Sequence, residues 1–115
     1  MTRLLPILLL VAGCQSAPVR MATSPESAMA CHVADGLTTA IAIQGGAVEA
    51  NPLMAPVVSA LGPWGFFAFK VGIGYLAYRL FKDVEDTESR QWAIGVHNLV
   101  ICGAAVNNAV VIGRQ

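Results

Sequence analysis

Residues 34–52, which read ADGLTTAIAIQGGAVEANP, decide the fold of this chain. The stretch begins as an apolar helix and breaks at Gly45-Gly46, because paired glycines favour a turn. Further apolar stretches follow it, each with the composition of a membrane-spanning helix. The segment is therefore expected to end the first of several membrane helices and to turn the chain back. Its polar side chains are Asp35, Thr38, Thr39, Glu49 and Asn51.

The composition indicates a membrane location. Of the 115 residues, 56% are hydrophobic and only 12% are charged. Soluble domains average about 25% charged residues, so this chain lacks the charged surface that water requires. The net charge is zero, which gives a nucleic-acid partner no electrostatic support. We expect a small integral membrane protein. The lipoprotein-like start and the family resemblance described below imply the bacterial cell membrane, meaning the inner membrane in a cell that has two.

Three segments are predicted to be transmembrane helices, for which about 20 apolar residues are needed. They cover residues 28–44, 63–81 and 92–112. The apolar run at 53–61 is too short to cross, and it is expected to form an interfacial or re-entrant helix after the first span. The fold class predicted is thus all-α, an integral membrane domain over residues 28–115 with three transmembrane helices.

The N-terminus resembles a bacterial lipoprotein signal. Arg3 precedes a short apolar run that ends in Val-Ala-Gly-Cys at residues 11–14. The run has the length of a signal-peptide core and is too short to cross a bilayer. We predict that residues 1–13 are removed as a signal peptide and that Cys14 is lipidated, so that a lipid anchors the mature N-terminus. The alternative is an ordinary hydrophobic start in which Cys14 is inert.

Residues 14–27 are predicted to form a flexible tether. Pro18 and Pro25, together with several serines, discourage helix in this segment. At its end, Ser24 followed by Pro25 is typical of a helix start, with serine as the N-cap and proline in the first turn.

The spacing of the three cysteines indicates neither a zinc site nor a disulfide framework. Cys14, Cys31 and Cys102 lie far apart, and no C-x-x-C spacing occurs. This pattern argues against a zinc site and against a disulfide framework.

The orientation in the membrane stays open. A lipidated Cys14 places the N-terminus outside the cytoplasm, and three spans then place the charged loop KDVEDTESR, residues 82–90, outside as well. Arg79, Lys82 and Arg90 flank or lie in this loop, and positive residues favour the cytoplasmic side. The two signals therefore disagree.

Polar residues inside the predicted helices are candidates for a common site. His32, Asp35 and Thr39 are spaced i, i+3, i+7 and share one helix face. A charge inside the membrane needs a partner, and Lys70 is the natural one for Asp35. With antiparallel helices, both lie roughly 10–14 Å below the same membrane surface. The candidate cluster as a whole comprises His32, Asp35, Thr38, Thr39, Glu49, Asn51, Lys70, Asn107 and Asn108.

Two roles remain open for this cluster. A buried ion pair with threonine and asparagine partners holds helices together in lipid. The other role is transport, binding or catalysis. Glu49 either pairs with Lys70 or caps backbone amides at the turn before Pro52. His32 and Asp35 have no second ligand pair nearby, and His97 is expected in the opposite half of the bilayer, so no metal and no other cofactor is predicted.

At these residues the chain resembles an uncharacterised family of small bacterial multi-span membrane proteins. The family pattern is an aspartate, a Thr-Thr pair, a glycine-rich break and Glu-x-Asn-Pro, followed by Gly-Pro, a lysine-bearing helix and a last helix with asparagines. In this chain the pattern runs over roughly residues 30–113. The resemblance implies a membrane fold and no activity. The lipoprotein-like start departs from the family's usual short cytoplasmic N-terminus.

The function expected is that of a small membrane protein of unknown activity, with a structural or partner-binding role. Membrane lipids, a second copy of the chain or another membrane protein are the expected partners. The alternative is a small transporter or pore component of holin type, although holins usually carry a basic tail and Gly113-Arg114-Gln115 is a poor one. An intramembrane enzyme using Asp35 or Glu49 is a third hypothesis, and no catalytic residue is assigned.

Overall fold

The computed structural model describes residues 17–115, and within this range the chain is helical with no strand. The all-α prediction is therefore confirmed. The helices are α2 (Ala17–Ala22), α3 (Pro25–Gln44), α4 (Ala55–Lys82) and α5 (Thr87–Gly113). The predicted signal peptide and Cys14 lie outside the described residues.

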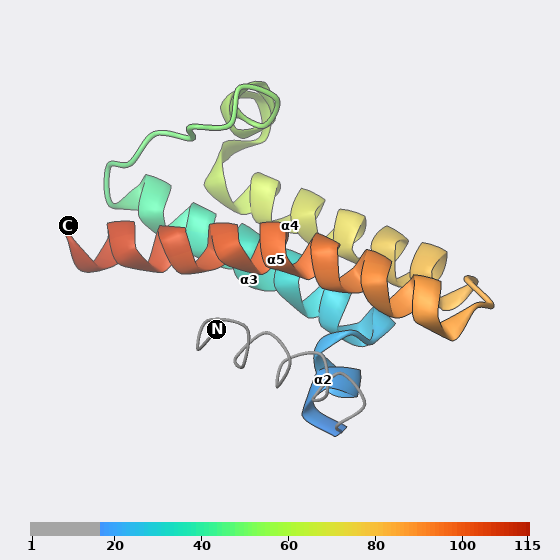
Figure 1. Cartoon of the computed structure of the whole chain (residues 1–115). Coiled ribbons are helices and arrows are strands. Elements are labelled where there is room, and N and C mark those ends of the chain that lie inside the picture. Colours follow the sequence, from blue (N-terminus) through green and yellow to red (C-terminus); the bar gives the residue numbers. More distant parts are fainter. Residues whose placement is uncertain (1–16) are drawn as a thin grey trace, which may run out of the picture.

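Helix α3 lies at the centre of the molecule and packs against both α4 and α5 (Figure 1). The backbones of α4 and α5 scarcely approach each other. Because α4 carries the chain back along α3, α5 runs in the same direction as α3. Residues about 70 positions apart are consequently neighbours, as in Ser27 with Asn98 and Thr38 with Asn108.

The ends of α3 follow from local sequence. The side chain of Ser24 accepts a hydrogen bond from the amide of Ser27, and Pro25 begins the helix, so the predicted helix start is confirmed. At the other end Gly46 has φ +104°, a conformation that favours glycine and turns the chain out of the helix. The side-chain amide of Gln115 donates to the carbonyl of Ala42 over 2.8 Å, which satisfies one of the free carbonyls at this end.

Helix α4 is bent sharply at Gly62. This residue has φ 73° and ψ 173°, and Pro63 follows it, so the backbone leaves the helical conformation at this point. The short part before the bend, residues 55–61, lies at a steep angle to the long part (Figure 1). It corresponds to the short helix expected after the first span, here joined to α4.

The predicted tether contains a helix. Ala17–Ala22 forms α2, although Pro18 was expected to prevent helix there. The reason is positional, because a proline in the first turn of a helix has no intrahelical amide bond to lose. The side chain of Asn98 in α5 donates to the carbonyl of Ala22 over 2.8 Å and connects the end of α2 to the bundle.

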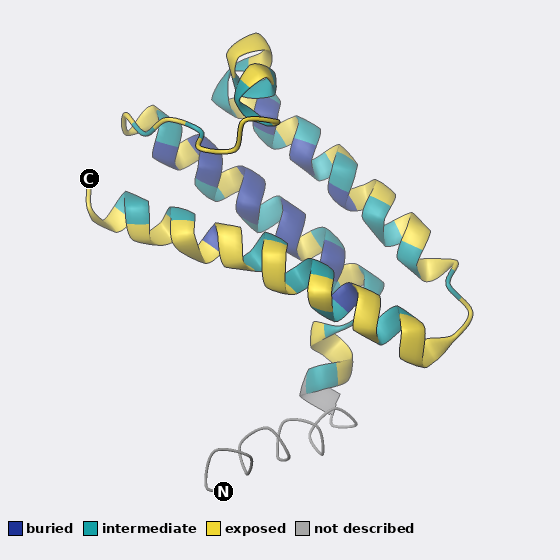
Figure 2. Ribbon diagram, turned by 45° about the horizontal axis from the view of Figure 1, so that its top comes forward, coloured by how far each residue is buried: buried dark blue, intermediate teal, exposed yellow. Residues whose placement is uncertain are grey.

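Many large apolar side chains of α4 and α5 are exposed, whereas several polar or charged side chains are buried in the bundle together with Phe66 and Ile94. Figure 2 shows that the buried residues are concentrated on α3 and that α4 and α5 are largely exposed or half-buried. The buried polar residues are His32, Asp35, Thr39 and Lys70. The exposed apolar residues on the two helices include Trp64, Leu76, Leu80, Trp92, Val96, Leu99, Val100 and Val106.

Two of the described helices, not the three predicted, are long and apolar enough to cross a membrane. They are α4 and α5, and few of the residues in either are buried. Helix α3 has 20 residues, enough for a crossing, so its length is not the obstacle. Its polar residues, with Glu26 and Asp35 among them, make it too polar to qualify on its own.

Close packing of α3 on α4 depends on two glycines. A Cβ at Gly36 would lie 2.7 Å from the Cβ of Lys70, and one at Gly74 would lie 2.9 Å from the Cβ of His32. We expect Gly36→Ala or Gly74→Ala to destabilise the protein by about 1–3 kcal/mol, the usual cost of overpacking. Thermal unfolding in detergent, followed by circular dichroism, measures the effect.

The matched controls are glycines of the same helices with free space around them. A Cβ at Gly72 of α4 or Gly103 of α5 would meet no atom within 4 Å. Gly72→Ala and Gly103→Ala should be neutral or stabilising by up to about 1 kcal/mol, since alanine favours helix over glycine. Equal destabilisation by all four changes would contradict the packing argument.

Candidate functional site

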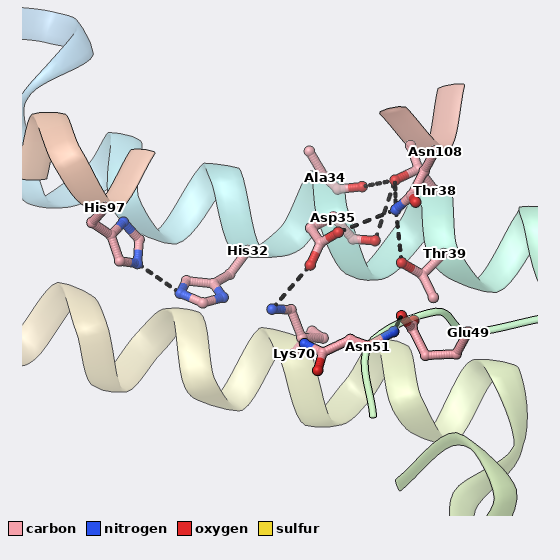
Figure 3. A network of polar contacts seen from close by, with 10 residues as sticks. All are labelled: His32, Ala34, Asp35, Thr38, Thr39, Glu49, Asn51, Lys70, His97 and Asn108. Carbon is pink, nitrogen blue, oxygen red and sulfur yellow. Dashed lines mark hydrogen bonds and ion pairs between the residues drawn. The ribbon is translucent and has the colours of Figure 1, made fainter. Parts of the chain in front are cut away.

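A buried ion pair joins α3 and α4. The Nζ of Lys70 lies 3.0 Å from the Oδ2 of Asp35 (Figure 3). Lys70 is only 6% exposed and Asp35 only 9%, so water screens the two charges little. The pair is formed because α3 and α4 cross closely at Gly36, which places the two side chains on facing surfaces.

Asn108 of α5 completes this group. Its Nδ2 lies 3.1 Å from Oδ1 of Asp35, 3.2 Å from Oγ1 of Thr38 and 2.8 Å from Oγ1 of Thr39. An amide nitrogen carries two hydrogens, so the three oxygens share two donors. Both oxygens of Asp35 thus have partners, Lys70 on one and Asn108 on the other. The group connects all three long helices through one carboxylate.

A hollow of about 350 Å³ opens from this group toward the loop after α3. Its wall combines the buried charges with polar residues of the loop and of α5, and apolar side chains such as Phe66 and Val111 complete it. Asn107 is exposed and lines the hollow without contacting the ion pair. The polar residues around the hollow are Asp35, Thr39, Glu49, Asn51, Lys70, Asn107 and Asn108.

Glu49 and Asn51 shape the loop at the mouth of the hollow. The Oε1 of Glu49 accepts from the amide of Asn51 over 2.9 Å, and the Oδ1 of Asn51 accepts from the amide of Leu53 over 3.0 Å. Of the two roles expected for Glu49, the structure therefore shows the capping of a backbone amide, while Lys70 pairs with Asp35.

A second polar group lies nearer the α2 end of α3. The Nε2 atoms of His32 and His97 are 2.8 Å apart, and the Nδ1 of His97 lies 2.9 Å from the Oδ1 of Asn98. The Nδ2 of Asn98 donates to Ser27 and to the carbonyl of Ala22, so its Oδ1 is the acceptor for His97. His32, expected beside Asp35, thus has its hydrogen-bond partner in α5.

The tautomers of the two histidines follow from these contacts. If the Nδ1 of His97 donates to Asn98, its Nε2 is the acceptor of a neutral ring, and the Nε2 of His32 must carry the hydrogen between the rings. The Nδ1 of His32 is then a bare acceptor. Among the described buried side chains it has no hydrogen-bond partner.

A disulfide connects α3 to α5, although the spacing of the cysteines argued against a disulfide framework. Cys31 and Cys102 are bonded, with their Cα atoms 4.8 Å apart, across a separation of 71 residues. Their separation equals that of Ser27 from Asn98, because two parallel helices keep the same register along their length. The spacing of the cysteines in the sequence could not predict this disulfide, because it depends on the register between α3 and α5.

Sequence reasoning placed most of the group around Asp35 and missed the group around His32 and His97. In the first group Asp35, Thr38, Thr39, Lys70 and Asn108 come together, with Glu49 and Asn51 at the mouth of the hollow. The residues missed as partners are His97, Asn98 and Cys102. A separation of 71 residues joins Ser27 to Asn98 and Cys31 to Cys102, while His32 contacts His97 across 65 residues.

The fold and the site define a small all-helical protein with a buried ion pair and two helices apolar enough to cross a membrane. The chain belongs to the DUF5658 family, a domain of unknown function, whose model matches residues 27–114. This agrees with the expected membership of an uncharacterised family over nearly the same residues. No curated protein and no solved structure matches the chain.

Proposed function

We propose that this chain is a small integral membrane protein of three crossing helices, with a structural or partner-binding role in the bacterial cell membrane. The observation that carries the proposal is the exposure of many large apolar side chains on α4 and α5 around a bundle that buries the Asp35–Lys70 ion pair. A core helix of a soluble protein would bury its apolar residues, whereas few residues of α4 and α5 are buried. In a lipid bilayer the exposed apolar surface of α4 and α5 carries no free-energy penalty, because lipid tails are as apolar as the side chains.

Helix α3 crosses with its neighbours rather than alone. A charge at the centre of a lone helix costs about 2.5–3.5 kcal/mol on the insertion scale. Here Asp35 has Lys70 and Asn108 as partners, so the polar face of α3 is covered by α4 and α5. Lys70 and Asn108 therefore supply the counter-charge and the hydrogen bond that Asp35 needs inside a membrane.

The disulfide supports an orientation with the α2 end outside the cytoplasm. Cys31 lies about 9 Å from the start of α3 at 1.5 Å per residue, and disulfides persist in oxidising compartments such as the periplasm. Lipidation of Cys14 requires the same orientation. Residues 1–13 then act as the signal peptide, and the C-terminus lies in the cytoplasm. The basic residues at 79–90 favour the opposite orientation, so they do not support this part of the proposal.

A second candidate function is that of a small transporter or pore component. The hollow favours it, because a purely structural ion pair needs no opening to the surface. An enzymatic role has less support, since the hollow has no nucleophile with an adjacent base among its described residues.

Membrane extraction tests the proposal independently of the lipid. We expect both the wild-type chain and Cys14→Ser to stay in the membrane pellet after alkaline carbonate treatment, because one acyl chain is a marginal anchor and three helices are not. A fatty-acid analogue should label only the wild type. Carbonate extraction of Cys14→Ser would contradict the membrane-spanning arrangement, and equal labelling of both would contradict lipidation.

A further inference from the structure

The two polar groups lie in line along α3. Figure 3 shows His97, His32, Lys70 and Asp35 in this order from the α2 end. Asn98, bonded to His97, precedes them, and the hollow opens beyond Asp35 toward the loop. On α3 the groups extend from Ser27 to Thr39, about 18 Å at 1.5 Å per residue, and the hollow continues beyond them. A purely structural ion pair would explain Asp35 and Lys70, but not the histidines and Asn98 that continue the line.

The line is interrupted at one place, between His32 and Lys70. The Nδ1 of His32 is a buried acceptor without a partner, and it lies on the side of the ring toward Lys70 (Figure 3). The ammonium of Lys70 has three hydrogens, and Asp35 is the only partner that the contacts of the described residues provide for them. A bare acceptor thus faces a donor with hydrogens to spare.

We propose that this line of side chains is a proton path through the bundle, with protons as the transported species. The inference rests on the membrane-spanning arrangement and on the transport candidate above. Imidazole suits the role because it can accept a proton on one nitrogen and release one from the other. The groups facing His32 are Lys70 from α4 and His97 from α5, with Asp35 on its own helix.

Each passage moves one proton in and one out. Lys70 gives a proton to Nδ1 of His32, directly or through one water, and regains one from water in the hollow beside Asp35. His32 releases its Nε2 proton to Nε2 of His97, and His97 releases its Nδ1 proton to water near Asn98. Both rings then hold the other tautomer and must turn or exchange protons before the next passage.

The test uses the purified full chain in vesicles of phosphatidylethanolamine and phosphatidylglycerol that contain a pH-sensitive dye. A potassium gradient with valinomycin sets the potential, and dye fluorescence reports proton entry. Wild type should acidify the vesicles. We expect His32→Gln and His97→Gln to lower the flux by about 100-fold, the lower end of the contribution of a positioned proton-transfer group. Glutamine keeps hydrogen-bonding ability but does not titrate.

Tyr75→Phe is the matched control, because Tyr75 is 51% exposed and lies outside the line. Its flux should equal that of wild type. If a histidine variant fails to fold, the wild-type protein still tests the proposal. A proton path predicts that the vesicles admit protons but not sodium ions under the same potential. Sodium entry at a similar rate, or unchanged flux in folded His32→Gln, would overturn the proposal.

The same vesicles separate this inference from the proposed function. Protein that carbonate leaves in the vesicles but that passes no protons overturns the proton path alone. Protein that carbonate extracts overturns the membrane-spanning arrangement and the path with it.

Discussion

Replacing one member of the Asp35–Lys70 pair should sharply lower the amount of folded protein, and replacing both should restore part of it. Asp35→Asn leaves the ammonium of Lys70 buried without a counter-charge, and Lys70→Met does the same to the carboxylate. Breaking a buried pair on one side typically costs about 3–5 kcal/mol. That is a large part of a total stability of about 5–15 kcal/mol. Yield of monodisperse protein in detergent and thermal unfolding measure the effect.

The double variant separates the pair from its surroundings. In Asp35→Asn with Lys70→Met no charge is stranded, and an amide at position 35 still offers an oxygen to Asn108. Glu49→Gln is the matched control, because Glu49 is part-exposed and its described contact is one backbone amide. Single variants as stable as the control would show that the ion pair does not hold α3 to α4.

Loss of the Cys31–Cys102 disulfide should be the second large effect. The bond closes a loop of 71 residues, for which the chain-entropy model gives about 4 kcal/mol at 25 °C. We expect Cys31→Ser, Cys102→Ser and the double variant to unfold at clearly lower temperature than wild type, and all three to a similar extent. Addition of a reductant should lower the unfolding temperature of wild type and leave the variants unchanged.

The state of these thiols in cells also reports the orientation. Alkylation with a mass-tagged maleimide, with and without prior reduction, distinguishes bonded from free cysteine on a gel. Protection of Cys31 and Cys102 without reduction is the expected result for an α2 end that faces an oxidising compartment. Free thiols in freshly lysed cells would place that end in the cytoplasm and would also argue against lipidation of Cys14.

The sequence alone was sufficient for the three long helices and for most of the polar group around Asp35. The glycine pair at 45–46, Ser24 before Pro25, and the need of Asp35 for a counter-charge each act locally or through one simple constraint. A charge in an apolar helix has few partners to choose from, so Lys70 could be named. Spacing along α3 and depth from the helix ends were enough to suggest Asn108.

The contacts between α3 and α5 were beyond such reasoning. Composition does not show that the two helices are parallel in a register of about 70 residues. This register joins Cys31 to Cys102, and it brings His97 within reach of His32, 65 residues before it. For a related reason, one of the three predicted spans, α3, is not apolar enough to qualify on its own. Helix α3 meets the length requirement, but its polarity becomes compatible with a membrane only through contacts made by other helices.

The central position of α3 has a consequence for biosynthesis. During synthesis α3 leaves the ribosome first, yet Lys70 follows Asp35 by 35 residues and Asn108 follows it by 73. In the proposed membrane-spanning arrangement, a lone α3 would carry an unpaired carboxylate into lipid, so stepwise release of independently stable helices, as in the two-stage scheme, does not suit it. That arrangement predicts that α3 and α4 enter the membrane together as a hairpin, after which α5 docks onto a surface already formed.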